Sequence, residues 1–186
     1  IFKFGGASVK DAEGVKNLAK VVQQQGSENT LVVISAMGKM TNAFEEVIDA
    51  YFYKSDTLQK KRTQVESYHK KMMDDLFEKD NEIYTQIDTL FEELDWFLNR
   101  NTSQRYNYVY DQIICFGELL STRIVSAYLK TVQLENNWLD VRNYIKTDSN
   151  YRDAKVNWTL TQQIITKKVA THQLNVTQGF IVFGRK

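Results

Sequence analysis

Residues 3–9, Lys-Phe-Gly-Gly-Ala-Ser-Val, decide the fold of this chain. The segment from Ile1 to Phe4 predicts a short buried strand, and the two glycines after it predict a tight turn. A helix is expected next, because apolar residues then recur at the spacing of a single buried helix face. These residues are Val15, Leu18, Ala19 and Val22. A strand, a turn and a helix in this order predict the start of an α/β unit.

A second unit of the same kind follows. The β-branched run at 31–34 predicts a strand buried on both faces. After a loop, Asn42 is expected to cap a helix, with Glu45 completing a capping box. Residues 57–98 then turn polar and carry two apolar stripes at helical spacing. The link near Asp80 predicts an antiparallel pair of helices that leaves the α/β core.

The rest of the chain returns to alternating helices and strands. We expect one long helix at 104–130, a strand at 138–141, a polar helix at 159–168 and a strand at 174–182. The predicted fold is α/β, a three-layer sandwich with a largely parallel central sheet and a helical excursion at about 57–98. Because there is no repeat, low-complexity tract or linker, we expect residues 1–186 to form a single domain.

Composition excludes several classes of function. The 186 residues carry a formal net charge of +1, which gives no field for nucleic acid or an anionic membrane. No apolar run reaches the roughly 18 residues that span a bilayer, and the first residues do not resemble a signal peptide. Cys115 is the one cysteine, so no disulfide is expected and a cytoplasmic location is favoured.

Four segments have the residue types to carry chemistry. Gly5 and Gly6, at a strand end before a helix, would offer backbone amides to a phosphate, and Lys3 would add a cation. The spacing matches neither the P-loop nor the dinucleotide fingerprint, and on its own a tight turn beside a surface lysine is the favoured explanation of this segment. Residues 35–42 follow the second strand, at the edge where α/β sheets bind ligands, but a capped loop would also account for them.

The other two segments lie later in the chain. Glu118 falls among apolar residues, and a buried carboxylate is costly unless it meets a cation such as a substrate ammonium group. The alternative is an exposed helix glutamate. The fourth segment pairs residues 138–142 with 177–181 at strand ends, where Arg142 would either bind a carboxylate or pair with Asp140. Neither histidine has ligands at metal-site spacing, so no metal held by protein side chains is expected.

In this order, the segments resemble the aspartate kinase branch of the amino acid kinase family. That family opens with Lys-Phe-Gly-Gly-Thr-Ser-Val and continues with Val-Ser-Ala-Met-Gly-x-x-Thr-Asn, Gly-Glu-x-x-Ser and Gln-Gly-Phe-Ile. The matching residues here are 3–9, 34–42, 117–121 and 178–181. The segments 140–142 and 147–148 also resemble the family's Asp-x-Arg and Thr-Asp stretch. The resemblance thus spans the chain.

The resemblance implies an enzyme that phosphorylates the side-chain carboxylate of L-aspartate with ATP, the first step of lysine, threonine and methionine synthesis. It implies that the ATP phosphates are bound by Lys3, Gly5, Gly6 and Ser8, with Lys3 also catalytic. It implies that aspartate is held by Ser35, Thr41, Glu118 and Phe180. Mg²⁺ would arrive with ATP, held largely by phosphates and water. The full-length protein would be a homo-oligomer.

Two departures from the family pattern bear on activity. Ala7 replaces the usual threonine, which removes one hydroxyl contact. After Phe180 the family continues to a Thr-Leu-Gly-Arg-Glu-Gly-Ser-Asp segment, whereas here the chain ends at Lys186. We therefore expect the N-terminal part of a catalytic domain, inactive by itself. The alternatives are a sister kinase for glutamate, acetylglutamate or a nucleotide, and a non-catalytic binding domain that uses 57–98 as its contact surface.

Overall fold

The computed structural model describes residues 1–169 and 173–179. Within these residues, four strands run parallel in one sheet, in the order β1-β2-β4-β3. Their bounds are Phe2–Phe4 for β1, Thr30–Ile34 for β2, Asn136–Leu139 for β3 and Leu174–Gln178 for β4. The register places Phe4 beside Ile34 and Ile34 beside Gln178. The carboxyl ends of these strands therefore lie side by side along one edge, and the predicted parallel α/β sheet is confirmed.

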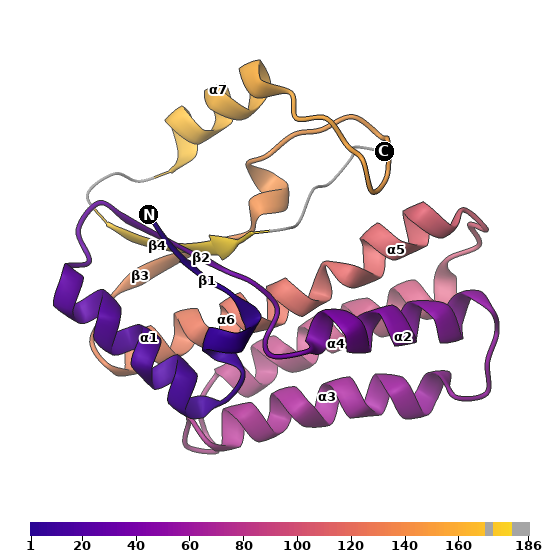
Figure 1. Cartoon of the computed structure of the whole chain (residues 1–186), viewed down its shortest axis with the longest axis horizontal. Coiled ribbons are helices and arrows are strands. Elements are labelled where there is room, and N and C mark those ends of the chain that lie inside the picture. The colour runs from indigo at the N-terminus through magenta and orange to yellow at the C-terminus, as the bar shows by residue number, and fades with distance from the viewer. Residues whose placement is uncertain (170–172, 180–186) are drawn as a thin grey trace.

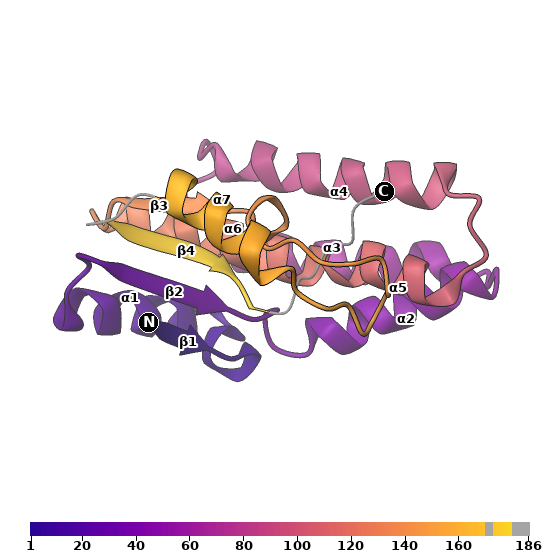
Figure 2. The ribbon, with the colours of Figure 1, turned by 90° about the horizontal axis from the view of Figure 1, so that it is seen from above.

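Helices cover both faces of this sheet. They are α1 (Ala12–Gln25), α2 (Met40–Phe52), α3 (Leu58–Asp74), α4 (Ile83–Arg100), α5 (Tyr106–Ile114), α6 (Phe116–Thr131) and α7 (Trp158–Lys168), with short 3₁₀ helices η1 (Gly6–Val9) and η2 (Val141–Asn143). Helices α1 and α6 lie under the sheet, and α6 contacts β2, β3 and β4. Helix α7 lies over the opposite face, while α2 to α5 extend beyond the sheet (Figures 1 and 2).

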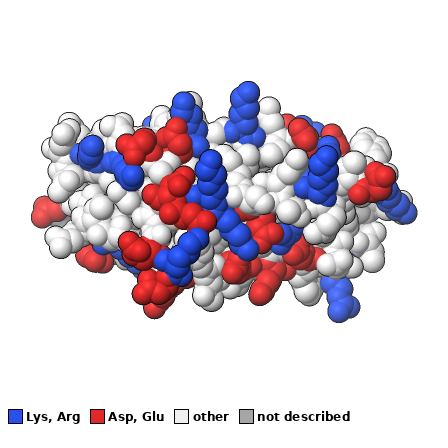
Figure 3. Space-filling model, turned by 90° about the horizontal axis from the view of Figure 1, so that it is seen from below, with Lys and Arg blue, Asp and Glu red and all other residues white. Residues whose placement is uncertain are grey.

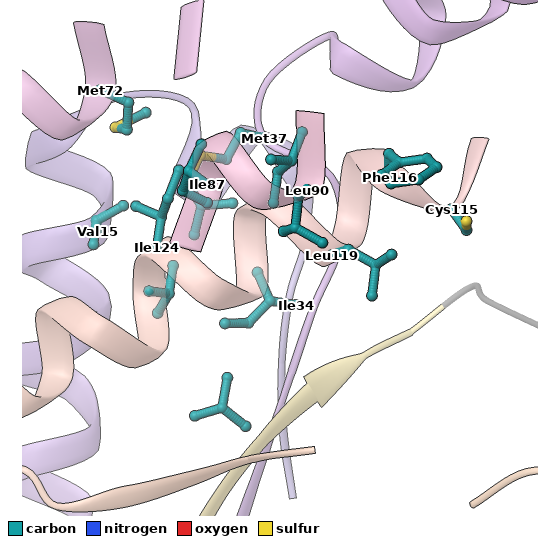
Figure 4. Close-up of a cluster of buried hydrophobic side chains, with 14 of the residues drawn as sticks. Val15, Ile34, Met37, Met72, Ile87, Leu90, Cys115, Phe116, Leu119 and Ile124 are labelled. Atoms are coloured by element: carbon teal, nitrogen blue, oxygen red, sulfur yellow. The ribbon is translucent and has the colours of Figure 1, made fainter. Parts of the chain in front are cut away.

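The main core lies between the sheet and α6. Strand β2 turns Val32 and Ile34 into it, and both are completely buried. Figure 4 shows Ile34 close to Leu119 and Ile124 of α6, with Met37 reaching the same cluster from the loop after β2. Full burial of each such side chain typically contributes about 1.5–3 kcal/mol. The loop that carries Met37 is therefore anchored in the core.

The predicted helical pair is confirmed as α3 and α4. Its antiparallel arrangement follows from two ion pairs, since Arg62 near the start of α3 meets Asp95 late in α4 at 2.7 Å, and Lys70 meets Asp88 at 3.5 Å. The Arg62 guanidinium also lies over the Phe91 ring, 4.9 Å from its centroid. On the face of the molecule that carries α3, basic and acidic side chains are interspersed rather than segregated (Figure 3). That face offers no field of a single sign.

The expected cap at Asn42 is wrong. Helix α2 begins at Met40, and Lys39 holds the N-cap position without a side-chain cap. The reason is that the Met40 N–H already bonds to the carbonyl of buried Met37 at 2.9 Å, which starts the turn early. Glu45 closes no capping box and instead accepts a hydrogen bond from the Tyr110 hydroxyl at 2.8 Å.

The single helix expected at 104–130 is also wrong, because the chain breaks at Cys115 into α5 and α6. There the Glu118 N–H bonds to the Cys115 carbonyl at 3.2 Å, the tighter i to i+3 pattern. The strand expected at 138–141 is shifted, since β3 spans Asn136–Leu139 and Val141 opens η2. The strand expected at 174–182 is observed as β4 over Leu174–Gln178, and residues 180–182 of the expected strand lie outside the described residues.

Candidate active site

The site occupies the edge where the parallel strands end. Gly5, Ser35 and Gly179 directly follow β1, β2 and β4, so three of the segments singled out in the sequence start side by side. The Ser35 N–H donates to the Phe4 carbonyl at 3.0 Å, which extends the ladder into the loops. Ligands of open α/β sheets bind at this carboxyl edge.

The first two loops interlock at Gly6. The Gly38 N–H donates to the Gly6 carbonyl at 2.9 Å. A Cβ on Gly6 would lie 2.6 Å from the carbonyl oxygen of Ala36 and 2.8 Å from that of Gly38, so only glycine fits. Gly5 differs, because a Cβ there would meet nothing within 4 Å. The second glycine is therefore required by the neighbouring loop, and the first leaves open space above the backbone.

Lys3, Ser8 and Thr41 present exposed side chains near these loops. Lys3 is in register with Val33, so its side chain leaves the sheet on the face opposite to buried Ile34. Within the described residues it makes no ion pair, which leaves its ammonium available to an anion. Thr41 lies in the first turn of α2, where its hydroxyl reaches solvent.

Helix α6 brings the third segment onto the second. The Ser121 hydroxyl donates to the Ser35 carbonyl at 2.9 Å. Gly117 allows the close approach, because a Cβ there would lie 3.2 Å from the Ala36 Cβ and 3.3 Å from the Phe44 ring. The start of α6 is therefore packed tightly against the loop after β2.

Glu118 joins the third segment to the fourth. It is only 6% exposed, so the exposed-helix alternative is wrong and the expected burial is confirmed. One carboxylate oxygen accepts the Gly179 N–H at 2.8 Å. A carboxyl group therefore lies buried at the carboxyl edge of the sheet, where the third and fourth segments meet.

A buried polar network behind Glu118 was not anticipated from the sequence. The Thr122 hydroxyl accepts hydrogen bonds from Gln178 Nε2 at 2.7 Å and Trp138 Nε1 at 2.9 Å, and donates to the Glu118 carbonyl at 2.7 Å. Gln178 in turn accepts the Val141 N–H at 2.8 Å. The network fixes the ends of β3 and β4 against α6. Its one sequence signal is a threonine four residues after Glu118, on the same helix face.

Three residues named in the sequence analysis remain, which are Arg142, Cys115 and Phe180. Arg142 pairs with Asp140, with Nε 2.9 Å and an Nη 2.6 Å from the carboxylate oxygens, so of the two alternatives the ion pair is the one formed here. Burial raises the pKa of Cys115 to about 12, which keeps it a thiol and not a nucleophile. Phe180, expected to border the substrate, lies outside the described residues.

The described residues do not fit a protein-built metal site. Across 1–169 and 173–179, no three His, Cys, Asp or Glu side chains gather closely enough to hold an ion.

Comparison with known proteins identifies the family of this chain. The sequence profile of the amino acid kinase family matches residues 1–186. The chain belongs to the amino acid kinase family. Its curated relatives are aspartokinases: it is 29% identical over 164 residues to bifunctional aspartokinase/homoserine dehydrogenase 1 of Arabidopsis thaliana, and 29% identical over 155 residues to aspartokinase 1 of the same plant. These matches cover 82% and 80% of the chain, but only 18% and 26% of the relatives.

The fold of this family member is likewise that of solved aspartokinases. Aspartokinase III of E. coli, in complex with aspartate and ADP, superposes with a TM-score of 0.84 at 22% identity. The match covers 98% of this chain and 41% of that one. At this identity the likeness establishes the fold. In the part of the chain that the structure describes, no helix is both long and apolar enough to cross a membrane.

Proposed function

We propose that the full-length protein phosphorylates the side-chain carboxylate of L-aspartate with ATP. The observation that carries this proposal is Glu118, a buried carboxylate that meets Gly179 at the edge where the glycine loops end. An amino acid substrate brings an ammonium group, and a carboxylate at this edge of the sheet would bind it. The aspartokinase relatives, and the aspartate and ADP in the E. coli structure, support this choice within the family.

The phosphate side of the proposed site consists of the first loop. Gly5 and Gly6 offer backbone close to the ligand, and Ser8 follows in η1 with an exposed side chain. Lys3 supplies an exposed cation from β1. We assign Lys3 the catalytic role, because positive charge beside the transferring group stabilises the negative charge that develops there.

The aspartate side consists of the second and third segments. Glu118 would bind the α-ammonium group, while Ser35 and Thr41 would orient the substrate from the loop after β2 and the start of α2. Phe180, which lies outside the described residues, would border the same pocket. The interlocked loops hold the two substrates next to one another, which lowers the entropic cost of bringing them together.

The chemical step needs no general base. An aspartate carboxylate oxygen, already ionised at neutral pH, attacks the γ-phosphorus of ATP. The new oxygen–phosphorus bond forms as the bond to the β-phosphate oxygen breaks, and ADP leaves with the electron pair. The chain contributes orientation and charge neutralisation. Because the described residues fit no metal cage, we assign no step to Mg²⁺ and propose that it enters bound to ATP.

The chain spans only 18% and 26% of the length of those two curated relatives. We propose that residues 1–186 form the N-terminal part of one catalytic domain, and that the full-length protein is a cytoplasmic homo-oligomer. The Arabidopsis relatives are chloroplastic.

The test offers the full-length protein ATP with one acceptor at a time. Hydroxylamine traps an acyl phosphate as a hydroxamate, so aspartate, glutamate and acetylglutamate are compared directly, and a nucleoside monophosphate is followed by ADP release. We expect hydroxamate with aspartate alone. Product only with another acceptor would identify a sister kinase. No turnover with any acceptor would favour a non-catalytic binding domain.

A further inference from the structure

Tyr68 of α3 is the point where the helical pair reaches the candidate site. Its hydroxyl donates to the Lys10 carbonyl at 2.5 Å, although the two residues are 58 positions apart. Lys10 directly follows η1, and Asp11 then caps α1. The bond therefore fixes the exit of the glycine loop.

The same hydroxyl also lies beside the second loop. A Cβ on Gly38 would lie 3.0 Å from the Tyr68 oxygen and 3.6 Å from the Lys10 Cβ. Gly38 has φ of +53°, a conformation that favours glycine. One oxygen atom thus bonds to the backbone at the end of the first loop and lies where a side chain at Gly38 of the second loop would approach it.

Helix α3 is a firm support for this contact. Arg62 donates to both carboxylate oxygens of Asp95 in α4, at 2.9 and 2.7 Å. His69, next to Tyr68, is completely buried, with its ring 6.1 Å from that of Phe91. The position of the Tyr68 side chain is therefore set by the packing of α3 on α4 rather than by the loops alone.

We propose that Tyr68 is a positioning residue, which keeps the glycine loop after β1 and the loop after β2 in register with each other. This inference rests on the proposed function and names a residue that none of the family motifs contains. Tyr68 acts through Lys10 and Gly38 rather than on the substrate. Without the Tyr68 hydroxyl, the two loops would adopt a wider set of arrangements before the nucleotide binds. Nucleotide binding would then cost more conformational entropy.

The test compares Tyr68→Phe with Tyr84→Phe in the full-length protein. Tyr84 is the matched control, since its hydroxyl bonds to Asp74 at 2.9 Å within the region of the helical pair. Calorimetry with Mg²⁺ and the non-hydrolysable analogue AMP-PNP measures binding, and steady-state kinetics measures both KM values. For Tyr68→Phe we expect about 2- to 10-fold weaker analogue binding and the same rise in ATP KM, the effect of one hydrogen bond, with a smaller change in aspartate KM. Tyr84→Phe should change neither.

A second pair of variants tests the contact with Gly38. Gly38→Ala should weaken analogue binding more in the wild-type background than in Tyr68→Phe, because the phenylalanine removes the oxygen that the new Cβ would approach. Equal effects of the two tyrosine variants, or strict additivity at Gly38, would overturn the role of Tyr68. Wild-type protein that binds the analogue yet phosphorylates no aspartate would refute the proposed function alone. Wild-type protein that binds no analogue would overturn both.

Discussion

The carbonyl oxygen of Gly6 accepts the N–H of Gly38 at 2.9 Å, and this one bond joins the loops that follow β1 and β2. The two glycines are needed for different reasons. Gly38 adopts a positive φ, whereas Gly6 has carbonyl oxygens where its side chain would be. The shape of the candidate site therefore depends on close backbone contact.

Gly6→Ala should destabilise the protein by about 1–3 kcal/mol, because the new Cβ would overlap two backbone oxygens. This overlap cannot be relieved by rotating a flexible side chain, since both atoms belong to the backbone. Gly5→Ala is the matched control. Gly5 has an ordinary extended conformation with φ of −76° and open space around it, so its free energy of unfolding should change by under about 0.5 kcal/mol. Urea unfolding measures both. Equal losses would show that the loops are not interlocked at Gly6.

Lys3→Ala should lower kcat by about 10²–10³-fold with a smaller effect on aspartate KM, the pattern for lost charge stabilisation of a transition state. Stability should hardly change, since Lys3 is exposed. Lys20→Ala, which removes an exposed lysine from α1, should leave kcat unchanged. Steady-state kinetics on the full-length protein provides the comparison, and a normal kcat in Lys3→Ala would end the catalytic assignment.

His69 should make stability depend on pH. Burial lowers its pKa from 6.5 to about 4, and Nε2 has no hydrogen-bond partner among the residues that the structure describes. Between pH 4 and pH 6.5 the unfolded chain binds a proton at His69 that the folded chain does not bind. The free energy of unfolding is therefore highest above pH 6.5 and falls as the pH drops toward 4. His69→Leu should remove about 2 kcal/mol of the loss between pH 7 and pH 5. Urea unfolding at both values tests this, and an identical pH dependence in the variant would contradict it.

Much of the architecture could be predicted from the sequence, because burial leaves a clear periodicity. The β-branched run of β2 and the apolar stripes of α3 and α4 were sufficient to predict these three elements. The errors lie where a backbone contact overrides a local signal. Asn42 is a good cap, but the bond from Met40 to the Met37 carbonyl starts α2 earlier.

Polar contacts between residues far apart in the chain were the other feature that the sequence did not predict. Asn136 opens β3 two residues before the expected strand, and its buried amide donates to the Ser126 carbonyl at 3.0 Å and accepts the Ser126 hydroxyl at 2.6 Å. Glu118 could be recognised as unusual, because a charge stood among apolar residues. Its partner Gly179 could not, since the contact joins residues 61 positions apart. The bond from Tyr68 to Lys10 was hidden for the same reason.

Glu118→Gln offers the most direct test of the central claim that this buried carboxylate holds the substrate ammonium group. Glutamine keeps an oxygen to accept the Gly179 N–H, so the fold should be retained. The lost charge-assisted hydrogen bond is typically about 1.5–3 kcal/mol, so aspartate KM should rise by roughly 10- to 150-fold. ATP KM should barely move. Steady-state kinetics on the full-length protein, varying each substrate in turn, gives both values. An unchanged aspartate KM, or an equal rise in both KM values, would contradict the assignment.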